Sequence, residues 1–444
     1  MKSWQTALLC IACTVSFSSI SAQAAPRGRA VFIVDNSVYP QLQAGLERYA
    51  AHVLAMHNIA CEPLPDDYYK MTPAEIRERL HREYQSSAVP LVGAIMVGPI
   101  PHACRSHDPS EIMIPCTLYY EDFDAEYTDT DGNGAFSDDE IKNDPSNNPS
   151  EIWVSWWVPP AMDAPSQLKH LKFFLDKLDR YYRGEIVGRD QILWTAGNVV
   201  KVEDVEGWTV LMQGTMKPLD QKLQIWSSIG QDPGTFRPNK RKEEHGPADF
   251  RTAFTLQPWQ HAHIIAHGNQ RGWYWDNTGV CVARDVSGRP EWSLLLDLST
   301  FGGTAANIVT TSGCSNGNFR GAYVGPAYDR ALPNLLLFSP DTVTVAYYGA
   351  ASPQSTNGFA GYCTELIESL KVDGGSYLGE GYYKMRNHDY SWGTQHYFFR
   401  CGDEKVLCGD PFARYRDSAP PSAEVQAEVQ KKIDAMKWEI TGPW

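Results

Sequence analysis

Two short segments of the chain end in residue types that together could cleave an amide bond. The apolar run in "HAHIIAHG" closes with His267 and Gly268, and the run in "NIVTTSGC" closes with Cys314. Both runs have the composition of buried strands, and ligands of open α/β sheets bind beyond the carboxyl ends of such strands. A thiol attacks only as a thiolate, and a nearby imidazole can hold or take its proton. The two segments therefore predict a Cys314/His267 dyad, provided that their strands are neighbours.

Backbone amides near the same two residues could stabilise the charge that such an attack creates. Attack on an amide carbonyl produces an oxyanion, which needs N–H donors already in place. Gly268 lets the backbone approach closely, so its N–H and that of Cys314 are the predicted donors. Each residue also has a purely structural interpretation, because a cysteine after an apolar strand is commonly a small buried hydrophobe or half of a disulfide.

Two other interpretations of the same segments compete with the dyad. His261, His263 and His267 have the same parity on an extended strand, and the H-x-H spacing resembles zinc ligation. No further ligand cluster is evident, and His261 and His263 could simply flank the sheet edge near the strand start. Residues 313–317 read Gly-Cys-Ser-Asn-Gly, which matches G-x-S-x-G with Ser315 as the nucleophile of an esterase. That motif should run from a strand into a helix, and the glycine-rich "NGNFRGAYVGP" that follows does not favour one.

The acidic segment "DTDGNGAFSDDE" fits a twelve-residue EF-hand loop that would bind Ca²⁺. The predicted oxygen ligands are Asp129, Asp131, Asn133, the Ala135 carbonyl, Ser137 through a water, and Glu140. Gly134 would allow the sharp turn of the loop. Clear helices are missing on both sides, so we expect a structural calcium loop inserted between strands. The alternative is a solvated acidic loop.

Alternating strand-like and helix-like segments predict an α/β fold. "AVFIVD" (30–35) and "LVGAIMVG" (91–98) read as buried strands, and Thr72 to Glu75 form a capping box that opens a helix between them. "APSQLKHLKFFLDKLDRYYRG" reads as an amphipathic helix capped by Ser166 and ended by Gly184. This order implies parallel sheets with right-handed crossovers.

The length of the chain favours two fused α/β subdomains with mostly parallel sheets flanked by helices. The expected division is an N-terminal subdomain over 25–188, a second subdomain over 189–417, and a helical tail over 418–444. The acidic insert occupies 121–149 within the first subdomain.

The N-terminus has the features of a signal peptide over residues 1–24. Lys2 precedes the apolar "TALLCIACTVSF", and Ala22-Gln23-Ala24 is a small-x-small cleavage site. The sequence therefore predicts a secreted or periplasmic protein without stable membrane insertion. In an oxidising compartment the remaining cysteines could form disulfides, for which Cys104–Cys116 and Cys401–Cys408 are local candidates. The connectivity stays open, as does the oligomeric state.

The overall composition limits the classes of partner. The chain has 43% hydrophobic and 21% charged residues, as ordinary globular proteins do, and its formal net charge is −14. That charge argues against nucleic acid or an anionic membrane as the main partner. The 14 Trp and 22 Tyr favour aromatic core packing over a carbohydrate-binding platform.

Several blocks of the sequence, taken together, resemble the gingipain family of cysteine peptidases in the caspase-like clan. The pairing of "IIAHGNQRGW" with "NIVTTSGCSNGNF" is similar to the family's two catalytic strand ends. "GAIMVGPIP", the block that opens with "SEIWVSWW", and Gly409-Asp410-Pro411 resemble further family segments, in the expected order over most of 30–415.

The resemblance implies an activity and assigns roles within it. Cys314 would be the nucleophile, His267 the general base or proton donor, and the N–H groups of Gly268 and Cys314 the oxyanion hole. The second subdomain would be caspase-like and catalytic, and protein or peptide substrates would pass through a thioester acyl-enzyme. The family's acidic partner of the histidine has no match, because Asn198 stands where it is expected. The third catalytic residue and the cleavage specificity stay open, and a non-catalytic caspase-like, calcium-binding secreted module is the competing class.

Overall fold

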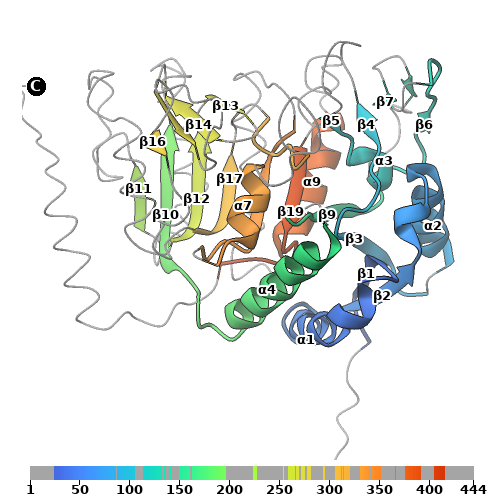
Figure 1. The fold of residues 1–444 in the computed structure, drawn as a ribbon, viewed down its shortest axis with the longest axis horizontal. Helices are drawn as coiled ribbons and strands as arrows, with labels where there is room; N and C mark the ends of the chain where they lie inside the picture. Colours follow the sequence, from blue (N-terminus) through green and yellow to red (C-terminus); the bar gives the residue numbers. More distant parts are fainter. Residues whose placement is uncertain are drawn as a thin grey trace, which may run out of the picture.

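The computed structural model places one large sheet at the centre of the molecule (Figure 1). The residues that it describes are 25–86, 88–105, 114–132, 135–136, 140–142, 150–160, 163–196, 224–227, 254, 259–265, 267–269, 272–275, 278–281, 294–295, 306–311, 313, 315–320, 331–340, 342–351, 366, 376–391 and 405–415. The predicted signal peptide and the helical tail lie outside these residues.

The sheet has ten strands in the order β11-β10-β12-β17-β18-β19-β9-β3-β1-β2. The strands are β1 (Gly28–Asp35), β2 (Ile59–Asp66), β3 (Leu91–Val97), β9 (Trp153–Trp157), β10 (Arg189–Ala196), β11 (Gln224–Ser227), β12 (Trp259–Ile265), β17 (Ala306–Thr311), β18 (Ala346–Ala350) and β19 (Lys405–Gly409). Among the described pairings of this sheet, all are parallel except that of β18 with β19. The predicted α/β class with a mostly parallel sheet is therefore confirmed.

Strand β19 joins the two predicted series of strands into one continuous sheet. It pairs antiparallel with β18 of the C-terminal series and parallel with β9 of the N-terminal series. The sequence predicts two subdomains with their own sheets, and the structure shows that their strands share a single hydrogen-bonded sheet. Strand β19, the last described strand of the chain, thus lies in the middle of the large sheet.

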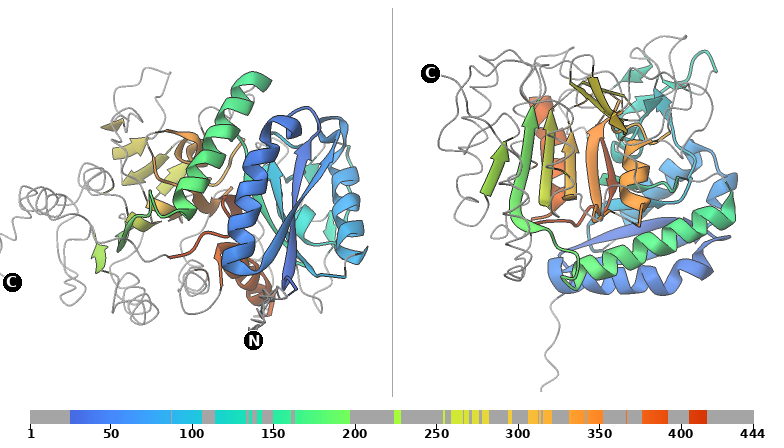
Figure 2. Two further views of the ribbon diagram at one scale, coloured as in Figure 1. Left: turned by 90° about the horizontal axis from the view of Figure 1, so that it is seen from below. Right: turned by 60° about the vertical axis from the view of Figure 1, so that its left-hand side comes forward.

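Helices pack on both faces of the sheet. Figure 2 shows α1 (Tyr39–His57) and α2 (Pro73–Ser86) on opposite sides of the N-terminal strands, as right-handed crossovers to neighbouring parallel strands require. Helix α4 (Ala164–Tyr182) packs against α1 and against α7 (Leu332–Phe338), whereas α9 (Leu378–Ser391) packs against β9. None of the described helices is both long enough and apolar enough to cross a bilayer.

The helix ends follow from local side-chain chemistry. The capping box before α2 is confirmed, since Thr72 N donates to Glu75 Oε2 at 2.7 Å and Glu75 N to Thr72 Oγ1 at 3.3 Å. Helix α4 begins two residues before the predicted cap. Asp163 is its N-cap and accepts the backbone N–H of Ser166 at 2.9 Å, so the prediction of Ser166 as the cap was wrong. Gly184 follows the end of α4 with a φ of +82°, which glycine adopts without strain.

The described residues form three small sheets besides the large one. One contains β13 (His267–Asn269), β14 (Gly272–Trp275), β15 (Thr278–Cys281) and β16 (Leu294–Leu295). The others lie in or beside the acidic insert and contain β4 (Cys104–Arg105), β5 (Ile114–Pro115) and β7 (Ala135–Phe136), and β6 (Glu126–Tyr127) with β8 (Ile141–Lys142). The short helix η1 (Tyr68–Lys70) precedes α2, and Figure 1 shows α3 (Leu118–Glu121) below β4 and β5.

The proposed local disulfides do not form in this structure. Cys104 is opposite Pro115, and the Cys116 N–H donates to Ala103 O, so the two cysteines stand one register position apart. Neighbouring positions along a strand face opposite ways, and the thiol of Cys104 is unbridged. Cys408 is likewise an unbridged thiol, buried in β19 in the middle of the large sheet, and Cys401 lies outside the described residues.

Aromatic side chains fill the core around β9, as the composition predicts. Trp153, Trp156 and Trp157 of this strand are all buried. In the same core, Asp410 accepts the Tyr49 hydroxyl at 2.5 Å and the Tyr182 hydroxyl at 2.9 Å. Burial and the Asp410 carboxylate raise the pKa of both tyrosines, so they remain neutral donors. The Gly-Asp-Pro segment therefore anchors α1 and α4 to the end of β19.

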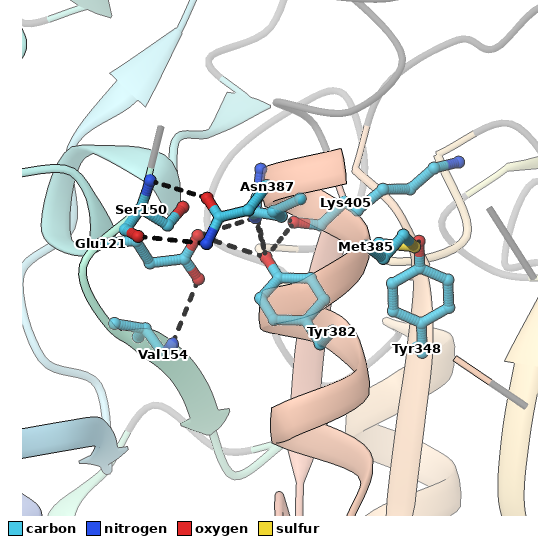
Figure 3. Close-up of polar contacts among 9 residues, drawn as sticks. Glu121, Ser150, Val154, Tyr348, Tyr382, Met385, Asn387 and Lys405 are labelled. Carbon is cyan, nitrogen blue, oxygen red and sulfur yellow. Dashed lines mark hydrogen bonds and ion pairs between the residues drawn. The ribbon is translucent and has the colours of Figure 1, made fainter. Parts of the chain in front are cut away.

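A buried ion pair connects the start of the acidic insert to the C-terminal half (Figure 3). Arg386 Nε of α9 lies 2.7 Å from Glu121 Oε2 at the end of α3, and both side chains are almost fully buried. Glu121 Oε1 also accepts the backbone N–H of Val154 at 3.1 Å. Arg386 donates in addition to the Tyr382 hydroxyl and to Lys405 O. Glu121 therefore holds α3, the start of β9 and α9 together.

Candidate active site

The two strands predicted to carry the dyad are parallel neighbours. Strand β12 pairs with β17, with His263 opposite Thr310 and Ile264 opposite Thr311. His267 and Cys314 each follow that last pair by three positions in the chain. The condition set by the sequence, that the strands be neighbours, is met. The side chain of His267 and the whole of Cys314 lie outside the described residues, so their separation is not measured.

The side chain of Asn316 connects the loop after β17 to the hairpin after β12. Its Nδ2 donates to the carbonyl of Gly272 in β14 at 2.8 Å, and its Oδ1 accepts the Thr311 hydroxyl at 3.2 Å. The same amide lies against Gly268, where an added Cβ would come within 2.4 Å of Oδ1. Asn316 is fully buried. The segments that flank Cys314 and His267 are thus in direct contact through one amide.

The Thr311 hydroxyl forms three hydrogen bonds, one of them with the Asn316 amide. It accepts Trp273 Nε1–H at 2.9 Å and Gly313 N–H at 3.1 Å, while it donates to Asn316. One hydroxyl supplies one donor and two acceptor lone pairs, so this set uses all of its capacity. The end of β17, the hairpin strand β14 and the loop are therefore fixed relative to one another.

The loop is held on its other side by β18. Gly317 N donates to Ala350 O at 2.5 Å, and the Tyr347 hydroxyl donates to Asn316 O at 3.1 Å. An added Cβ at Gly317 would meet Gly349 O at 2.4 Å, so only glycine allows this approach. Nothing in the sequence singles out Asn316, Thr311 or Tyr347. For Thr311, which ends β17, and Asn316, which follows it, the signal that could have found them is their place at the carboxyl end of a strand.

The structure argues against both competing interpretations of these segments. His261 Nδ1 bonds the Tyr415 hydroxyl at 2.6 Å and its Nε2 bonds Thr310 Oγ1 at 2.7 Å, so both of its ring nitrogens are engaged. His263 Nδ1 bonds the same Thr310 hydroxyl at 2.7 Å. Burial lowers the pKa of His261 and lowers that of His263 to about 4. The two histidines lie inside the sheet rather than at its edge, and both are neutral and bond the Thr310 hydroxyl, which does not favour a zinc site.

Ser315 does not have the geometry of an esterase nucleophile. It is buried, with a φ of +54°, and residues 315–317 form a turn. The nucleophile elbow of an esterase leads from a strand directly into a helix and exposes its serine. The positive φ instead turns the chain so that Asn316 reaches the hairpin.

The loop also packs on the N-terminal half of the chain. The ring of Phe319 lies against those of Trp156 and His102, with centroids 4.9 and 5.3 Å apart. Arg320 Nη1 lies 2.9 Å from Cys104 Sγ. Burial, with the charge of Arg320, lowers the pKa of His102 to about 3, so His102 is neutral. Both halves of the molecule therefore position the loop that carries Cys314.

The acidic insert brings three of the predicted calcium ligands together. Oxygen atoms of Asp129, Asp131 and Glu140 lie within 4.8 Å of one another, with the aspartates exposed and the glutamate buried. Thr130 donates its backbone N–H to Glu140 Oε1 at 2.6 Å and also donates its hydroxyl. Strand β7 places Ala135 beside β4, whereas Asn133 and Ser137 lie outside the described residues. Carboxylate oxygens at this separation fit a hard cation such as Ca²⁺.

Comparison with solved structures places this fold among known ones. The crystal structure of the Arg-specific cysteine proteinase gingipain R (RGPB) aligns with a TM-score of 0.56 and 14% sequence identity, over 90% of this chain and 81% of that chain. A second structure, of a protease, aligns with a TM-score of 0.60 and 11% identity, over 89% of this chain and 80% of that chain. The chain therefore shares its overall fold with gingipain R. At these identities the likeness shows the fold alone.

The likeness is visible in structure and not in sequence searches. No protein-family model matches the chain, and no curated protein sequence matches it. The expected gingipain-like fold is confirmed. The roles proposed for individual residues are argued from the contacts described above.

Proposed function

We propose that the chain is an exported cysteine endopeptidase that uses Cys314 as its nucleophile and His267 as its proton carrier. The observation that supports this most is the pairing of β12 with β17, because it sends the segments with these residues out from neighbouring strand ends. The contact of Asn316 with both segments supports it further. The export step is proposed from the signal-peptide pattern of residues 1–24.

In the proposed mechanism, the Cys314 thiolate attacks the carbonyl carbon of the scissile peptide bond. The N–H groups of Gly268 and Cys314 donate to the oxyanion of the tetrahedral intermediate. His267 then gives its proton to the leaving amine, and a thioester remains on Cys314. Water, deprotonated by His267, hydrolyses the thioester and restores the thiolate.

Calcium has a structural role in this proposal. Asp129, Asp131 and Glu140 would bind Ca²⁺ together with Asn133, the Ala135 carbonyl and Ser137 through a water. The ion would offset the repulsion of carboxylates held close together and would fix the insert against β4. The reaction itself involves no step at the ion.

Digestion of a peptide library, read out by mass spectrometry, tests the proposed activity. Wild-type protein with reductant and Ca²⁺ is expected to cleave, whereas Cys314→Ala and His267→Ala are expected to lose cleavage. Ser315→Ala is the matched control, because it changes the neighbouring residue and removes only the esterase nucleophile.

Three outcomes of this digestion distinguish the alternatives. Normal cleavage by Cys314→Ala refutes the assignment of the nucleophile. Loss of hydrolysis only in Ser315→Ala indicates a serine esterase. A wild-type protein that cleaves no peptide, although it is folded and has one alkylatable thiol, indicates a non-catalytic caspase-like module.

A further inference from the structure

A small cavity lies in the N-terminal half of the molecule, between α2, the segment after α3, the segment before β9, and α9. Its volume is about 220 Å³, which is enough for one side chain or a small molecule. Its lining residues are His81, Tyr84, Phe123, Asp124, Ser150, Glu151 and Tyr383. These residues belong to neither the candidate active site nor the predicted calcium loop.

Aromatic rings form one part of the cavity wall. The His81 ring stacks on Phe123, with centroids 5.1 Å apart and an angle of 13° between the planes. Tyr84 lies 5.5 Å from Phe123 and is 39% exposed, the highest exposure among the described large hydrophobic side chains. Tyr383 of α9 contributes a further ring. Faces of aromatic rings attract cations through their quadrupole.

Carboxylates form the other part of the wall. Glu151 Oε2 accepts the backbone N–H of Phe123 at 2.6 Å, which fixes its carboxylate beside the rings. Among the described residues, no cationic side chain forms an ion pair with Glu151. Asp124 adds a second carboxylate. The nearby Arg77 is directed elsewhere, since it donates to the carbonyls of Asp122 and Ala125.

A buried hydroxyl group completes the lining. Ser150 is 1% exposed, and its Oγ has no hydrogen-bond partner. A buried hydroxyl without a partner is costly unless a ligand or water satisfies it. Helix α9 fixes the backbone of Ser150, whose N–H donates to Asn387 Oδ1 at 3.2 Å (Figure 3).

We propose that this cavity binds an organic cation, a guanidinium or alkylammonium head group. Aromatic rings and carboxylates in one lining match the flat apolar faces and the charge of such a head group. A hard cation such as Ca²⁺ or Mg²⁺ would need about six or more oxygen ligands, which ring faces do not supply. An anion would meet two carboxylates. The head group can belong to a basic side chain of a polypeptide or to a free small cation.

The binding of n-butylguanidinium, compared with that of its neutral isostere n-butylurea, tests the proposal by titration calorimetry. Neither probe contains a peptide bond, and the protein is alkylated beforehand, so the result is independent of the proposed peptidase activity. We expect the cation to bind about tenfold more tightly than the urea. Glu151→Gln is expected to remove that preference while it keeps the shape of the side chain.

Asp176→Asn is the matched control, because it removes one carboxylate from the exposed face of α4, where Asp176 pairs with Arg48. It should leave the preference for the cation unchanged. Thermal unfolding of each variant separates loss of binding from loss of folding. Equal affinity for the two probes, or an unchanged preference in Glu151→Gln, overturns the proposal.

The pH dependence of binding provides a second readout. Burial, with the nearby Asp122 and Asp124 carboxylates, raises the pKa of Glu151 to about 7, so cation binding should weaken as the pH falls through that value. The other titratable groups at the cavity are His81, Tyr84 and Tyr383. An affinity that does not change between pH 6 and pH 8 contradicts the role of Glu151.

Two peptides distinguish the sources of the cation. Acetyl-Gly-Arg-Gly-amide is compared with the same peptide in which citrulline, its uncharged isostere, replaces arginine. A preference for the arginine peptide that exceeds that for n-butylguanidinium indicates a polypeptide ligand, and an equal preference indicates a small free cation. No preference for either cation contradicts the proposal.

Discussion

At the scale of single residues, Asn316 directly connects the two segments that carry the candidate dyad. It is buried, it contacts the hairpin that begins at His267, and it belongs to the turn that follows Cys314. Its two polar atoms reach Thr311 and Gly272, which lie on different elements. We therefore treat Asn316 as a positioning residue, which acts through the segments that it connects.

Asn316→Ala should lower kcat/KM of the proposed peptidase by about tenfold to a hundredfold, mainly through kcat. Small displacements of reacting groups cause losses of this size. The rate at which iodoacetamide alkylates Cys314, measured against pH, should also change, because the neighbouring imidazole would be displaced. Both the kinetic constants and the alkylation rate report on the positions of the reacting groups, and not only on whether the protein folds.

The control for Asn316 is Asn334→Ala. Asn334 is another buried asparagine, and the hydrogen bond described for its side chain goes to the same loop, at Phe319 O. It should cost similar stability with a much smaller effect on kcat. Equal kinetic losses in the two variants would show that Asn316 has only a general structural role.

Gly268→Ala should destabilise the fold through one specific collision. The added Cβ would lie 2.4 to 2.6 Å from the three atoms of the Asn316 amide. Overpacking of this kind costs about 1–3 kcal/mol. Because Asn316→Ala removes those atoms, the double variant should unfold at a higher denaturant concentration than the sum of the single effects predicts. Strict additivity in this double-mutant cycle would mean that the two residues are not in contact.

Among the elements, α9 is connected to the N-terminal half by its buried ion pair with Glu121. Replacement of Arg386 by Met would leave the Glu121 carboxylate buried without its cation, which costs about 3–5 kcal/mol. We expect a matching decrease in the midpoint of urea unfolding. The double variant Glu121→Gln with Arg386→Met should recover part of the loss, since no buried charge then remains uncompensated.

The exposed residue Arg183 provides the comparison for this ion pair. Arg183 pairs with Asp179 and Glu185 at the surface, and its side chain is 51% exposed. Arg183→Met should therefore cost less than about 1 kcal/mol. If Arg386→Met costs no more than Arg183→Met, the Glu121–Arg386 pair does not hold α9 in place.

The elements themselves were the part of the fold that the sequence predicted well. The apolar runs at 30–35 and 91–98 form β1 and β3, and the capping box opens α2, because these signals are local. The central place of β19 was not predicted, since it depends on pairing with strands far away in the chain. The contact between Asn316 and Gly272 and the lining of the cavity are equally non-local. Local patterns indicate which segments become strands, but not which strands become neighbours.

At the scale of the whole molecule, the acidic insert should make stability depend on calcium. If Ca²⁺ binds at Asp129, Asp131 and Glu140, a concentration one hundred times the Kd stabilises the folded state by about 2.7 kcal/mol. Addition of a chelator should lower Tm, and Ca²⁺ should restore it. Glu140→Gln should abolish the shift. A Tm that is independent of Ca²⁺ in the wild-type protein would contradict the predicted loop.

Stability should also depend on pH, in a direction that the buried carboxyl groups determine. Desolvation raises the pKa of Glu151 from 4.5 to about 7 and that of Asp122 from 3.8 to about 6. The folded state therefore holds these protons more tightly than the unfolded state, and their contribution to stability is lost as the pH rises through the two folded values. The buried His102 and His263 act in the opposite direction, because their lowered pKa values of about 3 and about 4 destabilise the fold as the pH falls below 6.5.

Glu151→Gln separates these opposing contributions. Glutamine does not ionise, so the variant should lose less Tm than the wild type between pH 5 and pH 8, and it should gain stability relative to the wild type at pH 8. Below pH 4.5 the wild-type carboxyl is protonated in both states, so the variant and the wild type should converge in their pH dependence, which the histidines then dominate. Thermal unfolding of both proteins across this range measures the difference. Parallel curves from pH 5 to pH 8 would mean that Glu151 ionises as an ordinary surface carboxyl, and the cavity would then not hold it away from water.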